Sequence, residues 1–342
     1  MMTDALTPRQ TIKSIVRGAA PPHPLLMPII FSLGARMENL PLRGFQANPT
    51  KIANALRQIR GVLRVDGLTC YSDEFLEAEA LGCRREWRDD GSSSITCPSF
   101  SGIDDLRGKM NSPDSLSSKG HIPVACEVLR RLKVMLKDEP ALMVRVNGPF
   151  SLAAQFLGHA FVPQGTQPRD LVEFAAEVTT SVSKALLEAG ADVILLTEIL
   201  PPGMSAETCD WYASLLSPVA NVVRFYEALP VLFLAGVVSE ANLSRFLERH
   251  RDCIPCWTPP AAELGKGRLS CLREGFAGIA LPAEAFRVAQ ACSPEVLANC
   301  ASDRRIVFVT SPEDLAETTQ PKDLARVLSA IREGLRPPAQ VG

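Results

Sequence analysis

Short apolar runs alternate along the chain with segments in which apolar residues recur every three to four positions. The second pattern is typical of helices that bury one face, and we expect such a helix over residues 171–189, where Gly190 ends it. The apolar runs have the length of strands and no polar break, as in parallel sheets that are covered on both faces. Eight of them fall within residues 25–31, 67–71, 141–146, 193–196, 231–235, 253–256, 276–281 and 306–309.

Eight strands separated mostly by helices predict an α/β fold, namely a closed (β/α)8 TIM barrel. An open, doubly wound sheet is the alternative. It is disfavoured because no glycine-rich dinucleotide-binding fingerprint follows any of the strands. We expect a single domain over residues 1–342, with the barrel core at about residues 20–312.

One segment departs from the strand–helix rhythm. In residues 83–97 polar and apolar side chains alternate around the turn signal Asp90-Gly91. This pattern predicts a β-hairpin inserted after the second strand. We expect the charged side chains of residues 84–90 to be exposed.

Composition narrows the classes of partner and compartment. The 342 residues carry 36 Lys and Arg against 38 Asp and Glu, a net charge of −2, which provides no basic face for nucleic acid. We expect no signal peptide, because the first residues show no basic stretch followed by an apolar run, and the sequence has no apolar run long enough to span a membrane. Its ten cysteines are spread widely and do not resemble the disulfide framework of a short secreted protein. We therefore expect reduced cysteines and a cytoplasmic location; a homodimer is left open.

In a TIM barrel the chemistry lies at the carboxyl ends of the strands. That rule selects Tyr71, Ser72 and Asp73 after the second strand, Asn147 after the third and Glu198 after the fourth. Because parallel strands bring these ends to one rim, we expect Asp73, Asn147 and Glu198 to line one cavity. We assign catalytic roles to Asp73, as an acceptor of N–H bonds, and to Glu198, as a proton donor or acceptor. The alternatives are that Asp73 caps the following helix and that Glu198 pairs with an arginine.

Several segments resemble two related families, the uroporphyrinogen decarboxylases and the cobamide-dependent methyltransferases. These segments are residues 7–18, 71–82 (YSDEFLEAEALG), 148–158 (GPFSLAAQFLG) and 190–194 (GADVI). They occur in the right order over nearly the whole chain. The resemblance implies a (β/α)8 barrel, in agreement with the strand count, and implies substrate-binding roles for Tyr71, Ser72, Asn147, Gln155 and Arg36.

The chain departs from the decarboxylases at residues that bind their substrate. The arginine-rich segment that holds the substrate carboxylates has only Arg36 and Arg43 as counterparts, in a different arrangement. Gln155 replaces a tyrosine, Ile199 replaces a serine, and the histidine near the last strand is missing. Asp73 is retained, and the resemblance implies that it accepts pyrrole N–H groups.

The chain also departs from the methyltransferases, which hold zinc through a His-x-Cys-Gly motif after the fifth strand and a later cysteine. Here the fifth strand ends in Phe-Leu-Ala-Gly at residues 233–236, and the last ends in Thr310-Ser311. The usual zinc site is therefore missing, and no recognisable motif binds a cofactor. His250, Cys253 and Cys256 form the fallback metal site. Cys253 and Cys256 are three apart on a strand and should face opposite sides, so packed thiols are the simpler interpretation.

Three functions remain open. The favoured one is a methyltransferase-like enzyme that acts on a methylated small molecule or a corrinoid, with the corrinoid supplied by a partner protein. The second is a carboxy-lyase that decarboxylates uroporphyrinogen or another tetrapyrrole. The third is a non-catalytic barrel that binds a tetrapyrrole, a corrinoid or a partner protein.

The lost ligands predict the metal content of the protein. Protein purified without chelator should hold no stoichiometric zinc, because Phe233, Ala235 and Thr310 stand where the methyltransferases have ligands. Elemental analysis measures this. About one zinc per chain would contradict the prediction and would direct mutagenesis to His250 and Cys253.

Overall fold

The computed structural model describes residues 6–89, 91–97, 103–110, 112–137, 139–157, 168–201, 204–236, 240–260, 274–287, 293–315 and 320–336. Eight parallel strands form one sheet in the order β1-β10-β9-β8-β7-β6-β5-β2 and curve into a nearly closed barrel, which confirms the predicted fold. The strands are β1 (Leu25–Leu26), β2 (Gly67–Tyr71), β5 (Ala141–Asn147), β6 (Val193–Glu198), β7 (Leu229–Leu234), β8 (Ile254–Trp257), β9 (Ala277–Ala280) and β10 (Ile306–Thr310).

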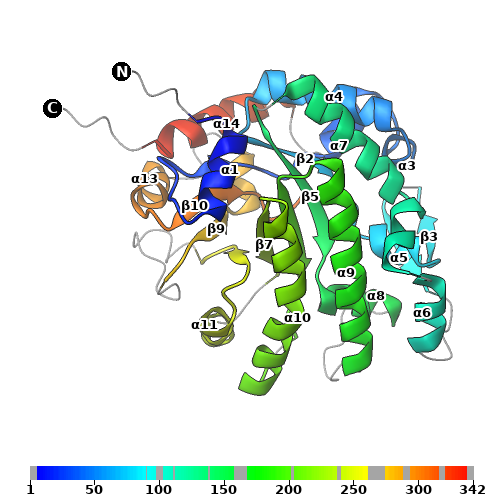
Figure 1. Cartoon of the computed structure of the whole chain (residues 1–342). Coiled ribbons are helices and arrows are strands. Elements are labelled where there is room, and N and C mark those ends of the chain that lie inside the picture. The colour runs from blue at the N-terminus through cyan, green and yellow to red at the C-terminus, as the bar shows by residue number, and fades with distance from the viewer. Residues whose placement is uncertain are drawn as a thin grey trace.

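The helices surround the barrel, and α14, α4, α7, α9 and α10 pack one against the next on its outer face (Figure 1). The helices are α1 (Pro8–Val16), α2 (Ser32–Met37), α3 (Leu42–Gln46), α4 (Pro49–Leu63), α5 (Leu76–Ala80), α6 (Ile103–Met110), α7 (Ile122–Leu136), α8 (Pro149–Phe156), α9 (Arg169–Ala189), α10 (Ala206–Phe225), α11 (Glu240–Arg249), α13 (Pro294–Ser302) and α14 (Pro321–Gly334). Two short 3-10 helices are η1 (Pro113–Ser118) and η2 (Ala283–Phe286). Within the described residues no helix is long and apolar enough to cross a membrane.

Side chains alternate across the barrel wall and separate the core into two parts. On β5, Ala141 and Met143 join the apolar cluster inside the barrel, whereas Leu142 and Val144 join the cluster between the strands and the helices. This alternation is the ordinary consequence of a pleated strand. It decides which polar residue can face the barrel interior.

The first and last strands of the order, β1 and β2, are joined by an aspartate. Asp66 donates its backbone N–H to the Leu26 carbonyl at 2.9 Å, and its carboxylate accepts the Leu26 N–H at 2.8 Å. Asp192 makes the same pair of contacts with Leu142, at the start of β6. The two aspartates thus align the strands at the amino-terminal end of the barrel.

Helix α1 covers this end of the barrel. Thr7 and Gln10 form a capping box that starts the helix, and Ile12 and Ile15 enter the inner core. Arg9 is 5% exposed and donates from Nε to the Asp192 carboxylate at 2.8 Å and from Nη1 to the Lys137 carbonyl at 2.6 Å. The buried ion pair therefore ties the covering helix to the barrel.

The inserted hairpin is present as β3 (Arg84–Trp87) and β4 (Ser93–Thr96), paired antiparallel. Arg84, Glu86, Arg88 and Asp89 are exposed as expected, but the structure corrects two other expectations. Cys83 and Cys97 form a disulfide at its base, so not all cysteines are reduced. The Arg85 side chain is 5% exposed and not on the surface, because the hairpin folds back over the end of β2 and pairs Arg85 with Asp73.

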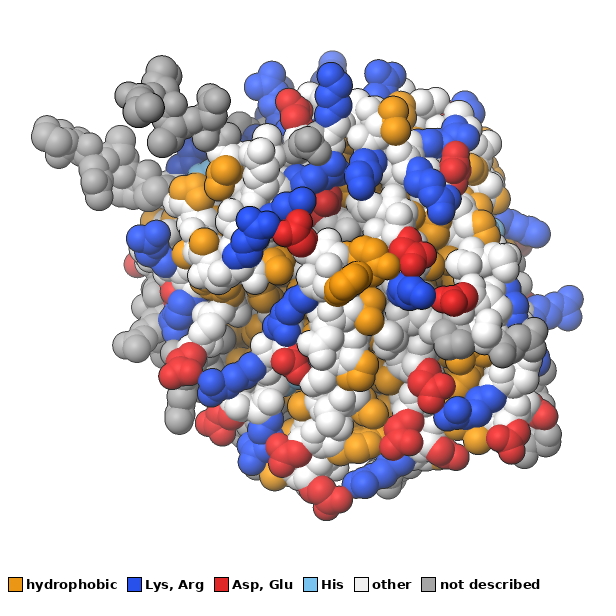
Figure 2. All heavy atoms as spheres, viewed as in Figure 1, with side chains coloured by type: hydrophobic (Ala, Val, Ile, Leu, Met, Phe, Trp, Pro, Cys, Tyr) orange, Lys and Arg blue, Asp and Glu red, His pale blue; other side chains and the backbone are white. Residues whose placement is uncertain are grey.

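The chain has nearly equal numbers of acidic and basic residues, and both kinds lie on its surface (Figure 2). On the face shown in Figure 2, acidic and basic side chains are intermingled.

The buried pair predicts a large loss of stability when one partner is removed. We expect Arg9→Met to lower the free energy of unfolding by about 3–5 kcal/mol, because the Asp192 carboxylate stays buried without its cation. Lys13→Met on the same helix is the matched control, since Lys13 pairs with Glu227 at the surface and should matter by less than about 1 kcal/mol. Urea denaturation measures both variants, and equal effects would contradict the prediction.

Candidate functional site at the carboxyl-terminal mouth of the barrel

Asp73 follows β2 and is bound by the inserted hairpin. Its carboxylate accepts the Phe75 N–H at 3.0 Å and forms a two-pronged ion pair with Arg85, whose Nη1 lies 3.1 Å from Oδ2. The Arg85 guanidinium also donates to Gln46 and lies 4.8 Å from the centre of the Trp87 ring. Asp73 thus binds the turn that precedes α5 but does not cap that helix, whose N-cap is Phe75 without a side-chain hydrogen bond, and the Asp73 charge is neutralised by Arg85.

Two more titratable groups lie against this pair. Glu79 lies 3.9 Å from Arg85 and accepts from His121 Nδ1 at 3.1 Å. This hydrogen bond raises the pKa of His121 and lowers that of Glu79. Ligand atoms of Asp73, Glu79 and His121 lie within 4.8 Å of one another, as a metal site requires. The Arg85 guanidinium already neutralises the acids, so a metal ion would have to displace it.

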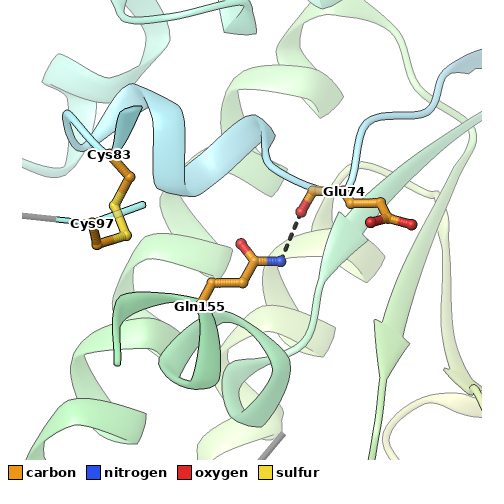
Figure 3. The surroundings of a disulfide bond; sticks show 4 residues. All are labelled: Glu74, Cys83, Cys97 and Gln155. Carbon is orange, nitrogen blue, oxygen red and sulfur yellow. Dashed lines mark hydrogen bonds between the residues drawn. A yellow bond between two sulfur atoms is a disulfide. The ribbon is translucent and has the colours of Figure 1, made fainter. Parts of the chain in front are cut away.

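Asn147 ends β5 and is held by the segment after β2. Its backbone N–H and its side-chain amide donate to the Glu77 carboxylate at 2.8 and 2.6 Å, and the amide also donates to the Glu74 carbonyl. Gln155 donates to the same Glu74 carbonyl at 2.8 Å (Figure 3). The Cys83–Cys97 disulfide lies beyond the other end of the same helical segment (Figure 3). Asn147 and Gln155 therefore fix this segment against β5 and α8.

The Glu198 side chain lies on the outer side of the barrel wall, between the strands and the helices. Val193 and Leu195 of β6 face inward, so Thr197 faces inward and Glu198 faces the helices. Its carboxylate accepts the Phe150 and Ser151 N–H groups at the start of α8, at 3.0 and 2.8 Å.

The Glu198 carboxylate is also bound by two hydroxyl groups, those of Ser151 and Tyr212. Burial raises its pKa, and these hydrogen bonds oppose the rise. A Cβ on Gly148 would lie 2.4 Å from Oε2 of Glu198, so the packing requires glycine there. Glu198 is thus a fully bonded carboxylate at a helix N-terminus.

The structure does not bring Asp73, Asn147 and Glu198 together around one cavity. They lie at the same end of the barrel, as expected, but each is bonded to a neighbouring element. The reason for Glu198 is its position along β6, one residue beyond the inward-facing Thr197. For Asp73 the reason is the hairpin, which carries Arg85 to its carboxylate.

The other expected substrate-binding residues have structural contacts or lie on the surface. Tyr71 is buried and donates from its hydroxyl to the Gln46 carbonyl at 3.0 Å. Ser72 is half-buried, and Arg36 is exposed on α2. None of these placements assigns a ligand contact, and their substrate-binding roles stay predictions.

Two of the fallback metal residues, His250 and Cys253, lie at the opposite end of the barrel, whereas Cys256 pairs in register with Phe233 further along the strand. His250 and Cys253 line a cavity of about 580 Å³ together with Ile15 of the covering helix and Phe276. Cys253 belongs to the outer core and Cys256 to the inner one, as their spacing along the strand requires. Burial lowers the pKa of His250 to about 4 and raises that of Cys253 to about 12.

The positions of the methyltransferase ligands offer no zinc site. Phe233 is buried in the inner core, and Ala235 packs against it. Thr310 is 1% exposed, with a hydroxyl group that has no hydrogen-bond partner among the described residues. A phenyl ring, a methyl group and a hydroxyl group do not match the imidazole and thiolate ligands that zinc prefers. The residues present therefore do not fit the metal.

Arg145 was missed by the rule that selects residues at strand ends. It lies within β5, two positions before the end, at an inward-facing position beyond Met143. Its Nε donates to the Thr197 hydroxyl at 2.9 Å, and the side chain is half-buried. The signal was visible in the sequence, because Arg145 interrupts the apolar run ALMVRVN.

The buried Glu77 carboxyl predicts a pH dependence of stability. Burial raises its pKa from 4.5 to about 7 in the folded chain. The unfolded chain releases this proton first, so stabilisation is complete below a pH of about 4.5 and is lost as the pH rises through about 7. In the wild type, ionisation of Glu77 should lower the unfolding free energy by about 3 kcal/mol between about pH 4 and pH 8. We expect Glu77→Gln to lack this contribution, because glutamine does not ionise. Urea denaturation at both pH values measures this fall. Glu207→Gln, at an exposed glutamate, is the control, and an unchanged fall in Glu77→Gln would contradict the prediction.

Known proteins resemble this chain in part of its sequence and in its fold. A methylated-thiol–coenzyme M methyltransferase of Methanosarcina mazei is 23% identical over 131 residues, 37% of this chain and 35% of that protein, so the match spans about a third of the relative. A solved methyltransferase from Methanosarcina mazei superposes with a TM-score of 0.73 at 19% identity, covering 96% of this chain and 99% of that chain. A B12-independent methionine synthase from a Shewanella species, in complex with selenomethionine, reaches 0.53 at 13% identity, covering 83% and 87%.

The family assignment follows from a match over much of the sequence. The family model described as uroporphyrinogen decarboxylase (URO-D) matches residues 7–236, which is more than half of the chain. This range includes the segments that carry Asp73, Asn147 and Glu198. The chain therefore belongs to the uroporphyrinogen decarboxylase (URO-D) family.

Proposed function

We propose that this chain is a cytoplasmic methyltransferase that acts at the carboxyl-terminal mouth of its barrel. The donor is a methylated small molecule, and the acceptor is a corrinoid carried by a partner protein. The observation that carries the proposal is the similarity to a methyltransferase over 96% of this chain and 99% of that chain. The matched stretch of the methylated-thiol–coenzyme M methyltransferase supports the same class of reaction.

The residues at the mouth also argue against tetrapyrrole decarboxylation. Asp73 is the acid that the decarboxylase resemblance would use to accept pyrrole N–H groups, and its oxygens are bound by Arg85 and Phe75. Arg36, the counterpart of the arginines that hold substrate carboxylates, is exposed on α2. A substrate with several acidic groups would therefore find few of the contacts that its decarboxylation requires.

Methyl transfer makes modest demands on the side chains of the protein. The nucleophile attacks the methyl carbon in line with the bond to the leaving group, which departs with the bonding electron pair. The positions corresponding to the zinc ligands carry no thiolate, so the nucleophile must come from the bound acceptor. The chain contributes an apolar floor, formed by Met143, Leu195 and Phe233, and a polar contact at Arg145 and Thr197. These groups orient the donor and exclude water from the mouth.

Transfer to a free corrinoid tests the proposal directly. The purified protein is mixed with chemically reduced cobalamin and a panel of methylated thiols, ethers and amines, each with a ¹³C-labelled methyl group. We expect labelled methylcobalamin to form at least about a thousandfold faster than without protein, a modest acceleration for an enzyme. Mass spectrometry measures the product, and the unmethylated parent compounds serve as controls.

The same preparation is tested with uroporphyrinogen, and the porphyrins are separated by chromatography. Loss of carboxyl groups from uroporphyrinogen would contradict the proposal. So would the absence of label transfer from every donor both to free cobalamin and to the corrinoid proteins of a cell extract.

A further inference from the structure

Arg145 is a cation placed among mostly apolar inner positions of the barrel. The inner positions of β5 are Ala141, Met143, Arg145 and, at the end of the strand, Asn147. The strand next to it contributes Val193 and Leu195. The register pairs Arg145 with Leu195 and Asn147 with Thr197, so the guanidinium reaches from the second-last inner position of its strand toward the rim. Carbon-rich walls therefore surround its stem.

One hydrogen bond fixes the direction of the guanidinium. Nε donates to the hydroxyl of Thr197, which is 3% exposed, on the neighbouring strand. Both ends of this contact lie on paired strands, so the side chain is held by rigid elements and not by loops. Held by Nε, the planar group still has two terminal nitrogens with which to bind a ligand.

Those nitrogens have no partner in the part of the chain that the structure describes. No described carboxylate lies within ion-pair distance of Arg145, and its contact with Thr197 is its sole hydrogen bond to a described residue. Other arginines of low exposure behave differently: Arg9 is paired with Asp192, Arg85 with Asp73 and Arg305 with Asp303. Arg145 is half-buried, so water reaches its terminal nitrogens, and an anion that replaces this water gains charge-assisted hydrogen bonds.

We propose that Arg145 binds an anionic oxyacid group of the methyl donor, a carboxylate or a sulfonate, and so makes the enzyme selective for anionic donors. The inference rests on the proposed function, because it names the class of donor for the same mouth. A guanidinium suits such a group, since two parallel N–H bonds match two oxygens of a carboxylate or a sulfonate. Thr197 is a positioning residue that holds Nε.

A binding experiment tests the inference without any reaction. The probes are trifluoroacetate, trifluoromethanesulfonate and, as the neutral control, trifluoroethanol, followed by ¹⁹F NMR line broadening. In the wild type we expect both anions to bind more tightly than the alcohol. In Arg145→Met we expect about 10- to 100-fold weaker anion binding, the range for hydrogen bonds to a charged group. Anion binding equal to that of the wild type would overturn the inference.

Three further variants keep the test independent of folding. Arg145→Lys retains the charge but loses the two parallel N–H donors of the guanidinium and the contact with Thr197. Its anion binding should therefore be weaker than in the wild type and stronger than in Arg145→Met. Thr197→Val leaves the arginine but frees its Nε, and should weaken anion binding by a smaller factor than Arg145→Met. Arg326→Met removes an arginine whose side chain is 80% exposed on α14, and should change nothing. Equal losses in Arg326→Met and Arg145→Met would overturn the inference.

Matched donors separate this inference from the proposed function. Methyl transfer is compared for 3-(methylthio)propionate and its neutral amide, and the ratio of their kcat/KM values is measured. We expect the wild type to prefer the acid by about 10- to 100-fold, and Arg145→Met to bring the ratio close to one. Transfer from both donors at equal rates would contradict the proposed selectivity for anionic donors but would support the proposed methyltransferase function. Anion binding that depends on Arg145, without transfer from any donor of the panel to free cobalamin or to corrinoid proteins, would sustain the anion site and contradict the methyltransferase.

Discussion

Successive residues of a barrel strand face opposite sides of its wall, and this constraint decides which polar groups can meet a substrate. On β6 it turns Thr197 toward the interior and Glu198 toward α8 and α10. On β5 the same alternation turns Arg145 inward beside Thr197. A shift of one residue in either strand would exchange these roles, so the chemistry of the mouth depends on the register of the whole sheet.

The acids at the rim hold the structure in place. A buried carboxylate is unfavourable unless hydrogen bonds satisfy it, and Glu198 has N–H and hydroxyl donors from α8 and α10. Glu77 binds both amide groups of Asn147, and Asp73 binds Arg85. Each acid thereby joins the end of a strand to the next element along the rim. A substrate would meet walls fixed by these bonds, which lowers the entropic cost of orienting it.

Much of the fold could be predicted from periodicity, because apolar strands and amphipathic helices are local patterns. The eight strands and the hairpin at residues 83–97 were predictable for this reason. The packing of the hairpin was not, since the contact of Arg85 with Asp73 depends on a fold-back that no local pattern encodes. The Cys83–Cys97 disulfide flanks the same hairpin. The sequence has ten cysteines, and their spacing did not indicate that these two would pair. The sequence did not predict which way the Glu198 side chain points. That depends on which residues of β6 face the barrel interior, and only the assembled barrel determines this.

The loss of the zinc ligands and the presence of Arg145 have a joint electrostatic consequence. Phe233, Ala235 and Thr310 are all neutral, so no thiolate is present to offset the arginine. Under the proposed function, a cationic donor would be repelled and an anionic one attracted, most strongly where the walls exclude water. When a neutral thioether loses its methyl group as a cation equivalent, the departing sulfur gains negative charge. A guanidinium already fixed on the oxyacid group of the same donor would favour this charge through space, at no cost in reorganisation.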